Sequence, residues 1–390
     1  MISHSCQSRT EGQPKAVELA RLGVDLRVVV PRRWKHYGRW RPTQLPIENA
    51  GFRLLRESIQ FPWMGPAQSY LHFYPGLERV LRDFSPDIID VWEEPWSAVS
   101  LQACFLRSKV CPDAALVSET EQNIEKTLPP PFEIFRARTL KQADWVIGRS
   151  EEALEISRRK GFQGPMRVVP NAVDADLFQP LSDDARAHQR KELGWGDEEF
   201  VAGYIGRLVE EKGLADFVEA LAQTPPSVRG VFVGQGPFEE SLREQIVRLG
   251  LESRISILPA KPPGELAPLM ACLDVLVLPS RTTPRWKEQF GRVLIEAGAC
   301  AVPVVGSDSG AIPGVIGDAG RVFPEGDARV LAHHLSELCA HRDEARALGQ
   351  NGLRAVRERY TWARVADAML AIYAELRPNA LSPEMRERAA

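Results

Sequence analysis

The chain alternates short β-branched runs with amphipathic helical patterns, and it does so in two separate series. In the first series the apolar runs are LRVVV (26–30), DIIDVW (87–92), AALVSE (114–119), WVIGRS (145–150) and MRVVPN (166–171). Helical patterns such as KAVELARLG and EEALEISRRKG separate them. Apolar strands that alternate with amphipathic helices are typical of βαβ units, which build a parallel sheet covered on both faces. The pattern therefore predicts an α/β domain.

A second series of apolar runs begins at residue 200, which predicts a second domain of the same kind. Its runs are FVAGYIGR (200–207), VRGVFVGQG (228–236), RISILP (254–259), VLVLPS (275–280), VPVVGS (302–307) and GRVFP (320–324). A chain of 390 residues also exceeds what one hydrophobic core normally spans. The polar, turn-rich segment 179–199 lies between the two series and is predicted to be the linker region. We therefore expect Rossmann-like domains at residues 1–178 and 179–360, followed by a helix and a frayed tail at 361–390.

Composition and charge narrow the classes of function. Hydrophobic residues make up 44% of the chain and charged residues 26%, and the formal net charge of −3 does not indicate nucleic-acid binding. No run approaches the roughly 20 apolar residues of a membrane span. The basic and aromatic segment 40–65 leaves peripheral membrane contact open, and the alternative is an ordinary exposed connection between strands. Six scattered cysteines without a C-x-x-C pair favour free thiols in a cytoplasmic protein: Cys6, Cys104, Cys111, Cys272, Cys300 and Cys339.

The segments that follow strands carry the candidate site, because open α/β sheets bind ligands at the carboxyl ends of their strands. The stretch GYIGRLVEEKG follows a strand and opens a helix, with Gly206 at the turn. A small residue lets the backbone approach a phosphate, and Arg207 and Lys212 add positive charge. This favours a diphosphate site, and the alternative is a turn with two solvated cations. Gly234 and Gly236 follow the next strand and are weaker candidates for contact with the same ligand.

The stretch EQFGRVLIE places two carboxylates around the expected start of a helix. Glu288 is predicted to lie in the loop ahead of this helix, and Glu296 on the helix a little over one turn in. Phe290 and Gly291 would present backbone N–H groups at the positive end of the helix, which suits phosphate oxygens. A carboxylate beside phosphates is stabilised when it accepts hydrogen bonds from sugar hydroxyls. One glutamate is therefore predicted to bind a hexose and the other a ribose, and the alternative is a surface helix residue and a loop acid near the helix dipole.

With these motifs in order, the C-terminal half resembles the family 4 retaining glycosyltransferases of the GT-B fold. The resemblance covers about residues 165–375, and the E-x7-E motif from Glu288 to Glu296 is its main feature. PNAVDADLFQP (170–180), GRLVEEKG (206–213) and PVVGSDSGAIPGVIGDAGRVFPEGD (303–327) stand in register with segments of that family. The resemblance implies two Rossmann-like domains that face a cleft. It also implies that the last helix, TWARVADAMLAIYAEL, crosses back to the first domain.

The resemblance implies roles for the motif residues. Arg207 and Lys212 would grip the diphosphate of a nucleotide sugar, and Glu288 would hold the transferred sugar; these three are the expected catalytic residues. Glu296 would bind the ribose. Family members need no metal, so no metal and no other cofactor is expected. The donor would be a UDP- or GDP-sugar, bound also by residues at the two glycine turns and the helix start: Gly206, Gly234, Gly236, Phe290, Gly291 and Arg292.

The N-terminal half departs from the family pattern. Members usually begin with a full first strand and a Gly-rich loop, whereas this chain opens with MISHSCQSRTEG, so either its true start lies upstream or its first strand is very short. Many members carry a His after the fourth or fifth strand, where this chain has VWEEPWS (91–97) and VSETEQN (117–123). For His4 and the nearby His72 the alternative is ordinary packing or a surface position. The acceptor-side candidates are His4, Glu93, Glu94 and Glu119.

These patterns together predict transfer of a hexose to a hydroxyl acceptor with retention of configuration, as in polysaccharide biosynthesis. The acceptor would be a glycan, a lipid-linked sugar or a small molecule, bound by N-terminal loops such as residues 34–73 and 122–135. Two alternatives stay open. One is a nucleotide-sugar-binding protein with a decayed acceptor site, and the other is a nucleotide-sugar epimerase on the same fold.

Overall fold

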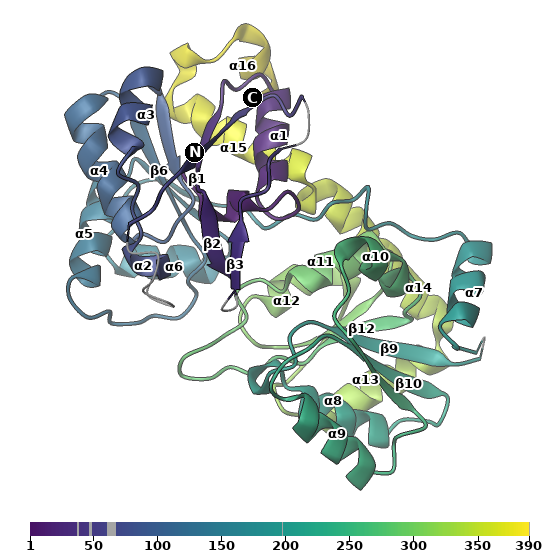
Figure 1. The fold of residues 1–390 in the computed structure, drawn as a ribbon. Helices are drawn as coiled ribbons and strands as arrows, with labels where there is room; N and C mark the ends of the chain where they lie inside the picture. The colour runs from purple at the N-terminus through teal and green to yellow at the C-terminus, as the bar shows by residue number, and fades with distance from the viewer. Residues whose placement is uncertain (37–38, 47–48, 61–67, 197, 390) are drawn as a thin grey trace. The chain divides into compact units, whose positions relative to one another are not determined.

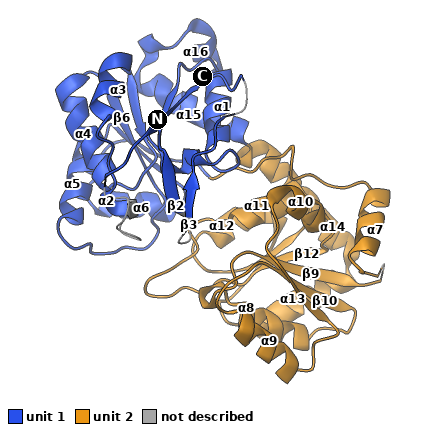
Figure 2. Ribbon diagram, in the orientation of Figure 1, with its two compact units in different colours: residues 1–170, 362–390 blue, residues 171–361 orange. Residues whose placement is uncertain are grey.

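The protein divides into two compact units (Figure 2). The computed structural model describes residues 1–36, 39–46, 49–60, 68–196 and 198–389. Unit 1 comprises Met1–Pro170 and Trp362–Ala390, and unit 2 comprises Asn171–Thr361. Parts of the segment 40–65, for which membrane contact was left open, lie outside the described residues, namely 47–48 and 61–65.

Unit 1 is built on a parallel sheet. Strand β1 (Arg27–Pro31) pairs with β4 (Arg53–Glu57), and β5 (Ile88–Val91), β6 (Ala115–Thr120), β7 (Trp145–Gly148) and β8 (Met166–Val168) follow in that order. Ile2 forms parallel bridges to both Val29 and Val91 and so joins the two ladders. A single residue therefore occupies the place of a strand between β1 and β5, and the chain continues directly into η1 (His4–Gln7).

Helices cover both faces of this sheet (Figure 1). Helices α3, α4 and α5 lie together on one side, while α1 packs against α15 on the other. Several begin at a side-chain cap; for example, the Ser150 hydroxyl accepts a hydrogen bond from the Ala153 amide at the start of α6. The helices of unit 1 are α1 (Gln13–Arg21), α2 (Gln68–Leu71), α3 (Leu77–Phe84), α4 (Ala98–Val110), α5 (Phe132–Gln142), α6 (Glu151–Arg159), α15 (Trp362–Leu376), η6 (Pro378–Ala380) and α16 (Pro383–Ala389).

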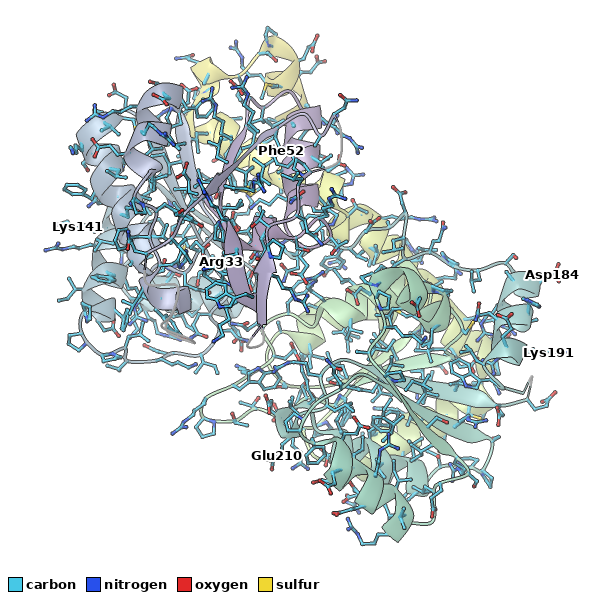
Figure 3. All side chains as sticks on the ribbon, viewed as in Figure 1. Arg33, Phe52, Lys141, Asp184, Lys191 and Glu210 are labelled. Atoms are coloured by element: carbon cyan, nitrogen blue, oxygen red, sulfur yellow. The ribbon has the colours of Figure 1, made fainter. Side chains whose placement is uncertain are left out.

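An antiparallel hairpin follows β1. It consists of β2 (Arg33–His36) and β3 (Arg39–Pro42). Trp34 on β2 is buried. Arg33, labelled in Figure 3, comes from the same strand, and its guanidinium lies over the ring of the half-exposed Trp40 at 5.0 Å from the ring centre. The hairpin therefore presents cations outward and one aromatic ring inward.

Unit 2 is a six-stranded parallel sheet with the order β11-β10-β9-β12-β13-β14. The strands are β9 (Phe200–Ile205), β10 (Val228–Val233), β11 (Ile255–Leu258), β12 (Val275–Leu278), β13 (Val304–Ser307) and β14 (Gly320–Phe323). The central strands are buried throughout, as expected for a sheet with helices on both faces. The order reverses between β9 and β12, so the loops after these two strands flank a topological switch point, where such sheets bind ligands.

Two helical layers enclose the sheet of unit 2 (Figure 1). Helices α8, α9 and α13 cover one face, and α10, α11 and α14 cover the other. One hydrophobic core extends from Val173 to Tyr360 and so belongs entirely to this unit. The helices are α7 (Asp183–Glu192), η3 (Glu210–Lys212), α8 (Leu214–Ala222), α9 (Glu239–Arg248), α10 (Pro263–Ala271), α11 (Arg292–Ala299), α12 (Ile312–Ile316), η4 (Gly317–Ala319), α13 (Ala328–Ala340), α14 (Arg342–Ala355) and η5 (Val356–Tyr360).

One sequence-based expectation about the connections was wrong. The segment 179–199, predicted as a linker, contains α7. The Ser182 hydroxyl caps this helix by accepting a hydrogen bond from Ala185, and Arg186 and Arg190 bind Asp274, which directly precedes β12. Polar composition resembled a linker, but these polar residues cap the helix and tie it to unit 2.

The C-terminal helix α15 belongs to unit 1, although the whole of unit 2 precedes it in the sequence. Its buried face packs on α1, and the Tyr373 hydroxyl donates a hydrogen bond of 2.8 Å to Asp90 in β5. Within the described part of the chain, none of the helices is both long and apolar enough to cross a membrane.

Candidate functional site

The loop after β9 carries the first cations of the candidate site. The Tyr204 hydroxyl donates a 2.7 Å hydrogen bond to the carbonyl of Arg207 and so fixes the backbone at that residue. The Arg207 side chain is 47% exposed, with Glu211 at 3.9 Å. Lys212, at the end of η3, is 14% exposed and lies 4.7 Å from the ring centre of Trp286. One cation of this loop is therefore open to solvent and the other is held within unit 2.

The loops after β9 and β10 are joined backbone to backbone. The Leu208 amide donates to Gln235, and the Phe238 amide donates to Leu208, each at 3.0 Å. A Cβ atom at Gly234 would lie 1.8 Å from the Gly206 carbonyl oxygen, and one at Gly236 would lie 2.1 Å from the Leu208 carbonyl oxygen. These two glycines were predicted as ligand neighbours. In the structure, both positions need glycine because the two loops approach each other too closely there for a side chain.

Glu288 lies in the loop after β12, as predicted, and is paired with Lys212. The Lys212 Nζ atom is 2.5 Å from Glu288 Oε2, which also accepts a 2.9 Å hydrogen bond from the buried Ser280 hydroxyl. Glu288 is 8% exposed. The left-handed Gly213 makes the approach of the two loops possible, because a Cβ atom there would lie 1.9 Å from the Pro279 carbonyl oxygen.

Helix α11 starts directly after Glu288 at the same edge of the sheet. Gly291 is its N-cap, with φ 78°, and Arg292 is its exposed first residue. The first N–H groups of a helix have no partner within it, so this end offers donors and a positive dipole. Phe290 is buried against Tyr360, with ring centres 6.0 Å apart, so only its backbone can serve a ligand. Glu296 is the fifth residue of the helix and is partly exposed.

The loop that carries Glu288 is anchored by residues that sequence reasoning missed. Asp216, buried in the first turn of α8, binds the Arg281 guanidinium through both oxygens. This pairing raises the pKa of Arg281. Thr282 is held by Glu325 through its backbone amide and its hydroxyl. The anchors lie 43 and 65 residues from their partners, so no local motif could have indicated them.

Unit 2 thus brings Lys212, Glu288 and the start of α11 together at the carboxyl ends of β9 and β12, with Arg207 on the same loop as Lys212. A cation and a helix N-terminus favour phosphate groups. A carboxylate that already accepts two hydrogen bonds can accept others from hydroxyl groups. The arrangement suits a ligand that joins phosphates to a polyol.

In unit 1, the predicted candidates His4 and Glu93 lie in contact. His4 Nδ1 is 2.8 and 2.7 Å from the two Glu93 carboxylate oxygens, and the His4 backbone amide donates to the same carboxylate at 2.6 Å. Burial alone would raise the pKa of Glu93. The charge and hydrogen bonds of His4, together with the nearby His72 imidazole, nevertheless hold this pKa below its usual value. Glu93 in turn raises the pKa of His4, against burial.

Glu94 points to different partners from Glu93. It accepts hydrogen bonds from the Thr120 hydroxyl at 2.7 Å and the Glu121 amide at 2.9 Å. Burial raises the pKa of Glu94 to about 7. The two adjacent carboxyl groups therefore differ in charge at neutral pH, since Glu93 is ionised and Glu94 is about half protonated.

Glu119 lies apart from these candidates, inside the sheet. Its carboxylate binds the buried Lys15 ammonium and the Arg149 guanidinium, and Asp90 lies 3.8 Å from Lys15. These cations lower the pKa of Glu119 to about 2, overcoming the opposing effect of burial. A fully buried carboxylate is expected to be paired with cations in this way. An acceptor-side role for Glu119 stays a prediction. Across the residues that the structure describes, His, Cys, Asp and Glu side chains nowhere gather as the ligands of a metal would.

Comparisons with known proteins identify what the chain resembles. Residues 185–355 match the family model described as glycosyl transferases group 1, and residues 16–177 match that of glycosyltransferase family 4. The D-inositol 3-phosphate glycosyltransferase of Segniliparus rotundus is 34% identical over 226 residues, which are 55% of this chain and 48% of that protein. The GDP-mannose-dependent alpha-(1-6)-phosphatidylinositol monomannoside mannosyltransferase of Mycolicibacterium smegmatis is 33% identical over 54% of this chain and 57% of its own. The match spans about half the length of these curated relatives.

Solved structures resemble the chain over nearly its full length. Anabaena HepE, crystallised with UDP and glucose, superimposes with a TM-score of 0.70 at 20% identity and covers 96% of this chain and 98% of its own. The sucrose-phosphate synthase of Thermosynechococcus elongatus gives 0.69 at 22% identity, covering 96% and 98%. At this level of identity the likeness concerns the fold, which is GT-B with two Rossmann-like domains.

Proposed function

Because this chain belongs to the family 4 glycosyltransferases of the GT-B fold, we propose that it transfers a hexose from a nucleotide diphosphate sugar to a hydroxyl group, with retention at the anomeric carbon. The observation that carries the proposal is the Lys212–Glu288 pair beside the start of α11. The cation and the helix start suit the diphosphate, and the carboxylate suits the hydroxyls of the sugar.

In this proposal each element of the site has one task. Lys212, Arg207 and the amides at Gly291 bind the diphosphate and stabilise the negative charge that grows on it as the sugar departs. One preorganised donor of this kind contributes roughly 3 kcal/mol to the rate. Glu288 holds the sugar and Glu296 holds the ribose. The Ser280 hydroxyl keeps the Glu288 carboxylate in place at 2.9 Å when Lys212 turns to the phosphates.

The donor is a UDP- or GDP-sugar, and no metal takes part. Uracil and guanine nucleotides both have support among similar proteins, since HepE was crystallised with UDP and the M. smegmatis relative is GDP-mannose-dependent. Metal independence is supported by the cations of Arg207 and Lys212, which can neutralise the phosphates. Activity that survives excess EDTA would support it, and activity that returns only with added Mg²⁺ would contradict it.

Thermal shift with UDP, GDP, UDP-glucose and GDP-mannose tests the donor site, because a ligand that binds only the folded state raises its stability. One nucleotide series should raise the melting temperature in the wild type. Release of nucleoside diphosphate without added acceptor then separates an enzyme from a nucleotide-sugar-binding protein. Conversion of the sugar of intact donor would indicate the epimerase instead. The anomeric proton coupling of the product reports retention or inversion.

The acceptor and the location of the protein are broader proposals. The acceptor is a glycan, a lipid-linked sugar or a small molecule with a free hydroxyl, and a panel of these with the identified donor would reveal it. A cytoplasmic location is supported by the scattered cysteines, and contact with the inner membrane face by the basic segment 40–65. Cell fractionation at low and high salt tests both, because an electrostatic contact is lost at high salt.

A further inference from the structure

Trp286 lies on the loop after β12, shortly before Glu288. Its ring lies beneath the Lys212 ammonium, with the Nζ atom 4.7 Å from the ring centre. The same Nζ atom is 2.5 Å from Glu288 Oε2. A cation over the face of an indole is attracted by the electrons of the ring. The Lys212 ammonium is therefore held between an indole face and a carboxylate, all within unit 2.

A tight turn fixes the backbone of Trp286. The Thr283 amide donates a 2.8 Å hydrogen bond to the Trp286 carbonyl, and the Thr283 hydroxyl accepts one of 2.9 Å from the Trp286 amide. Nearer to β12, the Arg281 guanidinium is bound by Asp216 of α8. Contacts inside unit 2 therefore order the segment that carries the indole.

The Trp286 ring does not serve the packing of unit 2. Phe290, on the same loop, is buried in the hydrophobic core. Trp286 is partly exposed, and among the residues that the structure describes it belongs neither to this core nor to the side chains packed against it. A single exposed aromatic residue needs no explanation by itself. This one lies beside a cation and a carboxylate, and ligand pockets combine aromatic walls with a few such polar groups.

We propose that Trp286 binds the transferred sugar of the donor through the face of its indole ring. This rests on the proposed function, in which Lys212 turns from Glu288 to the diphosphate. That movement takes the ammonium off the indole, so the ring face becomes free as the sugar enters. The C–H groups on one face of a hexose form an apolar surface. This surface packs on the indole while the hydroxyl groups at the edge of the sugar reach Glu288.

The position of Trp286 favours the sugar over the nucleobase. The carboxylate that shares Lys212 with the ring is Glu288, to which the sugar is assigned. The ribose is assigned to Glu296, the fifth residue of α11, and the base is attached to the ribose on the side away from the phosphates. Stacking on uracil or guanine would strengthen binding of the free nucleotide, whereas packing on the sugar acts only in the intact donor.

Calorimetric titration of wild type, Trp286→Phe and Trp286→Ala measures this difference, with UDP-glucose against UDP or GDP-mannose against GDP. Trp286→Ala should weaken binding of the nucleotide sugar about ten-fold, as expected for the loss of one aromatic contact. Binding of the nucleoside diphosphate should stay equal or become slightly tighter, because the ring no longer competes with the phosphates for Lys212. Trp286→Phe keeps a flat ring and should restore most of the affinity for the nucleotide sugar.

Tryptophan fluorescence gives a readout that a merely structural residue would not change. The emission of an indole shifts to shorter wavelength when a ligand excludes water from its ring. Saturating nucleotide sugar should produce this shift in the wild type, and the nucleoside diphosphate, which absorbs light equally but lacks the sugar, should produce less of it. The additional shift should be absent in Trp286→Phe.

Trp195→Phe is the matched control. Its ring also lies beside a cation, with Arg190 6.0 Å from the ring centre, but Trp195 precedes β9 and so lies at the opposite edge of the sheet from the donor loops. This variant should keep both affinities and the fluorescence shift of the wild type.

Two results would overturn the proposal. One is a folded Trp286→Ala that binds the nucleotide sugar within about two-fold of the wild type. The other is an equal loss for both ligands, which would mean that the ring stacks on the base or supports the fold. If Trp286→Ala does not fold, a full shift in Trp286→Phe has the same consequence. A wild type that binds no nucleotide sugar would instead show that the proposed function itself is wrong.

Discussion

At the scale of single residues, Lys212 and Glu288 form an ion pair, so the two side chains that are proposed to bind the donor neutralise each other when no donor is bound. Each side chain is largely buried, so the loss of one leaves the other charge poorly solvated. A donor that offers a phosphate to Lys212 and hydroxyls to Glu288 would replace the pair with two better-matched contacts. The ion pair therefore holds the Lys212 ammonium and the Glu288 carboxylate in position until a donor binds.

Lys212→Ala and Glu288→Ala should accordingly differ in kind. Lys212→Ala should weaken binding of free nucleoside diphosphate about ten-fold, as expected for the loss of one charged hydrogen bond. Glu288→Ala should leave that affinity equal or slightly higher, since Lys212 is released from its carboxylate, but should weaken binding of the intact nucleotide sugar. Calorimetric titration with both ligands measures the difference.

Lys261→Ala is the control for Lys212→Ala, because Lys261 pairs with the exposed Glu265 at 3.3 Å on the same unit. It should change neither affinity. Equal losses for both ligands in both site variants would contradict the separate roles of Lys212 and Glu288.

Glu94 should make the fold less stable as the pH rises. Its pKa is about 7 in the folded protein and 4.5 in an unfolded chain. Between these values the folded state keeps a proton that the unfolded state releases, so the free energy of unfolding falls with increasing pH. The effect is of the order of 3 kcal/mol at most, from 1.36 kcal/mol per pH unit. Urea denaturation at pH 5 and pH 8 measures it.

Glu94→Gln is the matching variant, because glutamine keeps the shape of the protonated acid but does not titrate. The pH 5 to pH 8 difference in unfolding free energy should shrink in this variant. Some difference should persist, since burial and Glu119 raise the pKa of Asp90 to about 6 as well. An unchanged difference would mean that Glu94 does not carry the proton.

At the scale of elements, the carboxyl edge of unit 2 is assembled by backbone contacts between consecutive loops. Gly234 is the tightest of these contacts, because an added Cβ atom would lie 1.8 Å from the Gly206 carbonyl oxygen. Neither loop can give way easily, since the Gly206 amide is bonded to Val233 and the Gly234 amide to Leu258. The donor loops therefore depend on small residues for their mutual position.

Gly234→Ala should lower the free energy of unfolding by several kcal/mol and abolish donor binding, as expected when a side chain is forced against backbone. Gly264→Ala is the control, because a Cβ atom there has no atom within 4 Å and the residue lies in α10. That variant should be as stable as the wild type or more stable by up to about 1 kcal/mol. Thermal melts of both variants check this, and a stable, donor-binding Gly234→Ala would refute the contact.

The β-branched runs predicted the strands of both main sheets well, because the central runs are buried on both faces and tertiary packing reinforces the local pattern. Strand β4 and the β2–β3 hairpin were missed. Their sequences, RLLRE, RWKH and RWRP, carry charges at most outward positions and lack β-branched residues. They are strands because β1 and the hairpin partner supply hydrogen bonds, which composition does not record.

The candidate site was also predicted only in part: its residues were recognised, but the contacts between them were not. Lys212 and Glu288 were recognised from motifs around each, but their direct contact joins positions 76 residues apart. Glu119 was grouped with Glu93 because both lie in segments where many family members carry a His. Its ion pair with Lys15, which lies 104 residues away on α1, could not be predicted in this way. Such pairs depend on the strand order, and a sequence pattern gives the strands without their order.

At the scale of the whole molecule, the two units differ in how they are encoded. Unit 2 is one continuous segment with its own core. Unit 1 needs two segments, since α15 supplies buried residues that pack on α1 and near Asp90: Val365, Ala366, Met369, Leu370, Ile372 and Tyr373. Each large apolar side chain among these contributes roughly 1.5–3 kcal/mol when buried, so together they match the stability of an ordinary domain.

Fragments should reveal this difference. A chain of residues 171–361 should melt cooperatively and bind the same nucleoside diphosphate as the full protein. A chain of residues 1–170 should show no cooperative transition until a peptide of residues 362–390 is added. Circular dichroism during heating measures both. A cooperative melt of residues 1–170 alone would show that α15 is dispensable.

The return of α15 to unit 1 also sets an order of events during synthesis. A ribosome completes Asn171–Thr361 before it makes Trp362–Leu376. Domains generally fold as units while the chain emerges. Unit 2 can therefore reach its final structure while unit 1 still lacks a helix, and the sheet of unit 1 must wait with the α1 face uncovered throughout the synthesis of unit 2. The part of the protein that is made first is the part that finishes folding last.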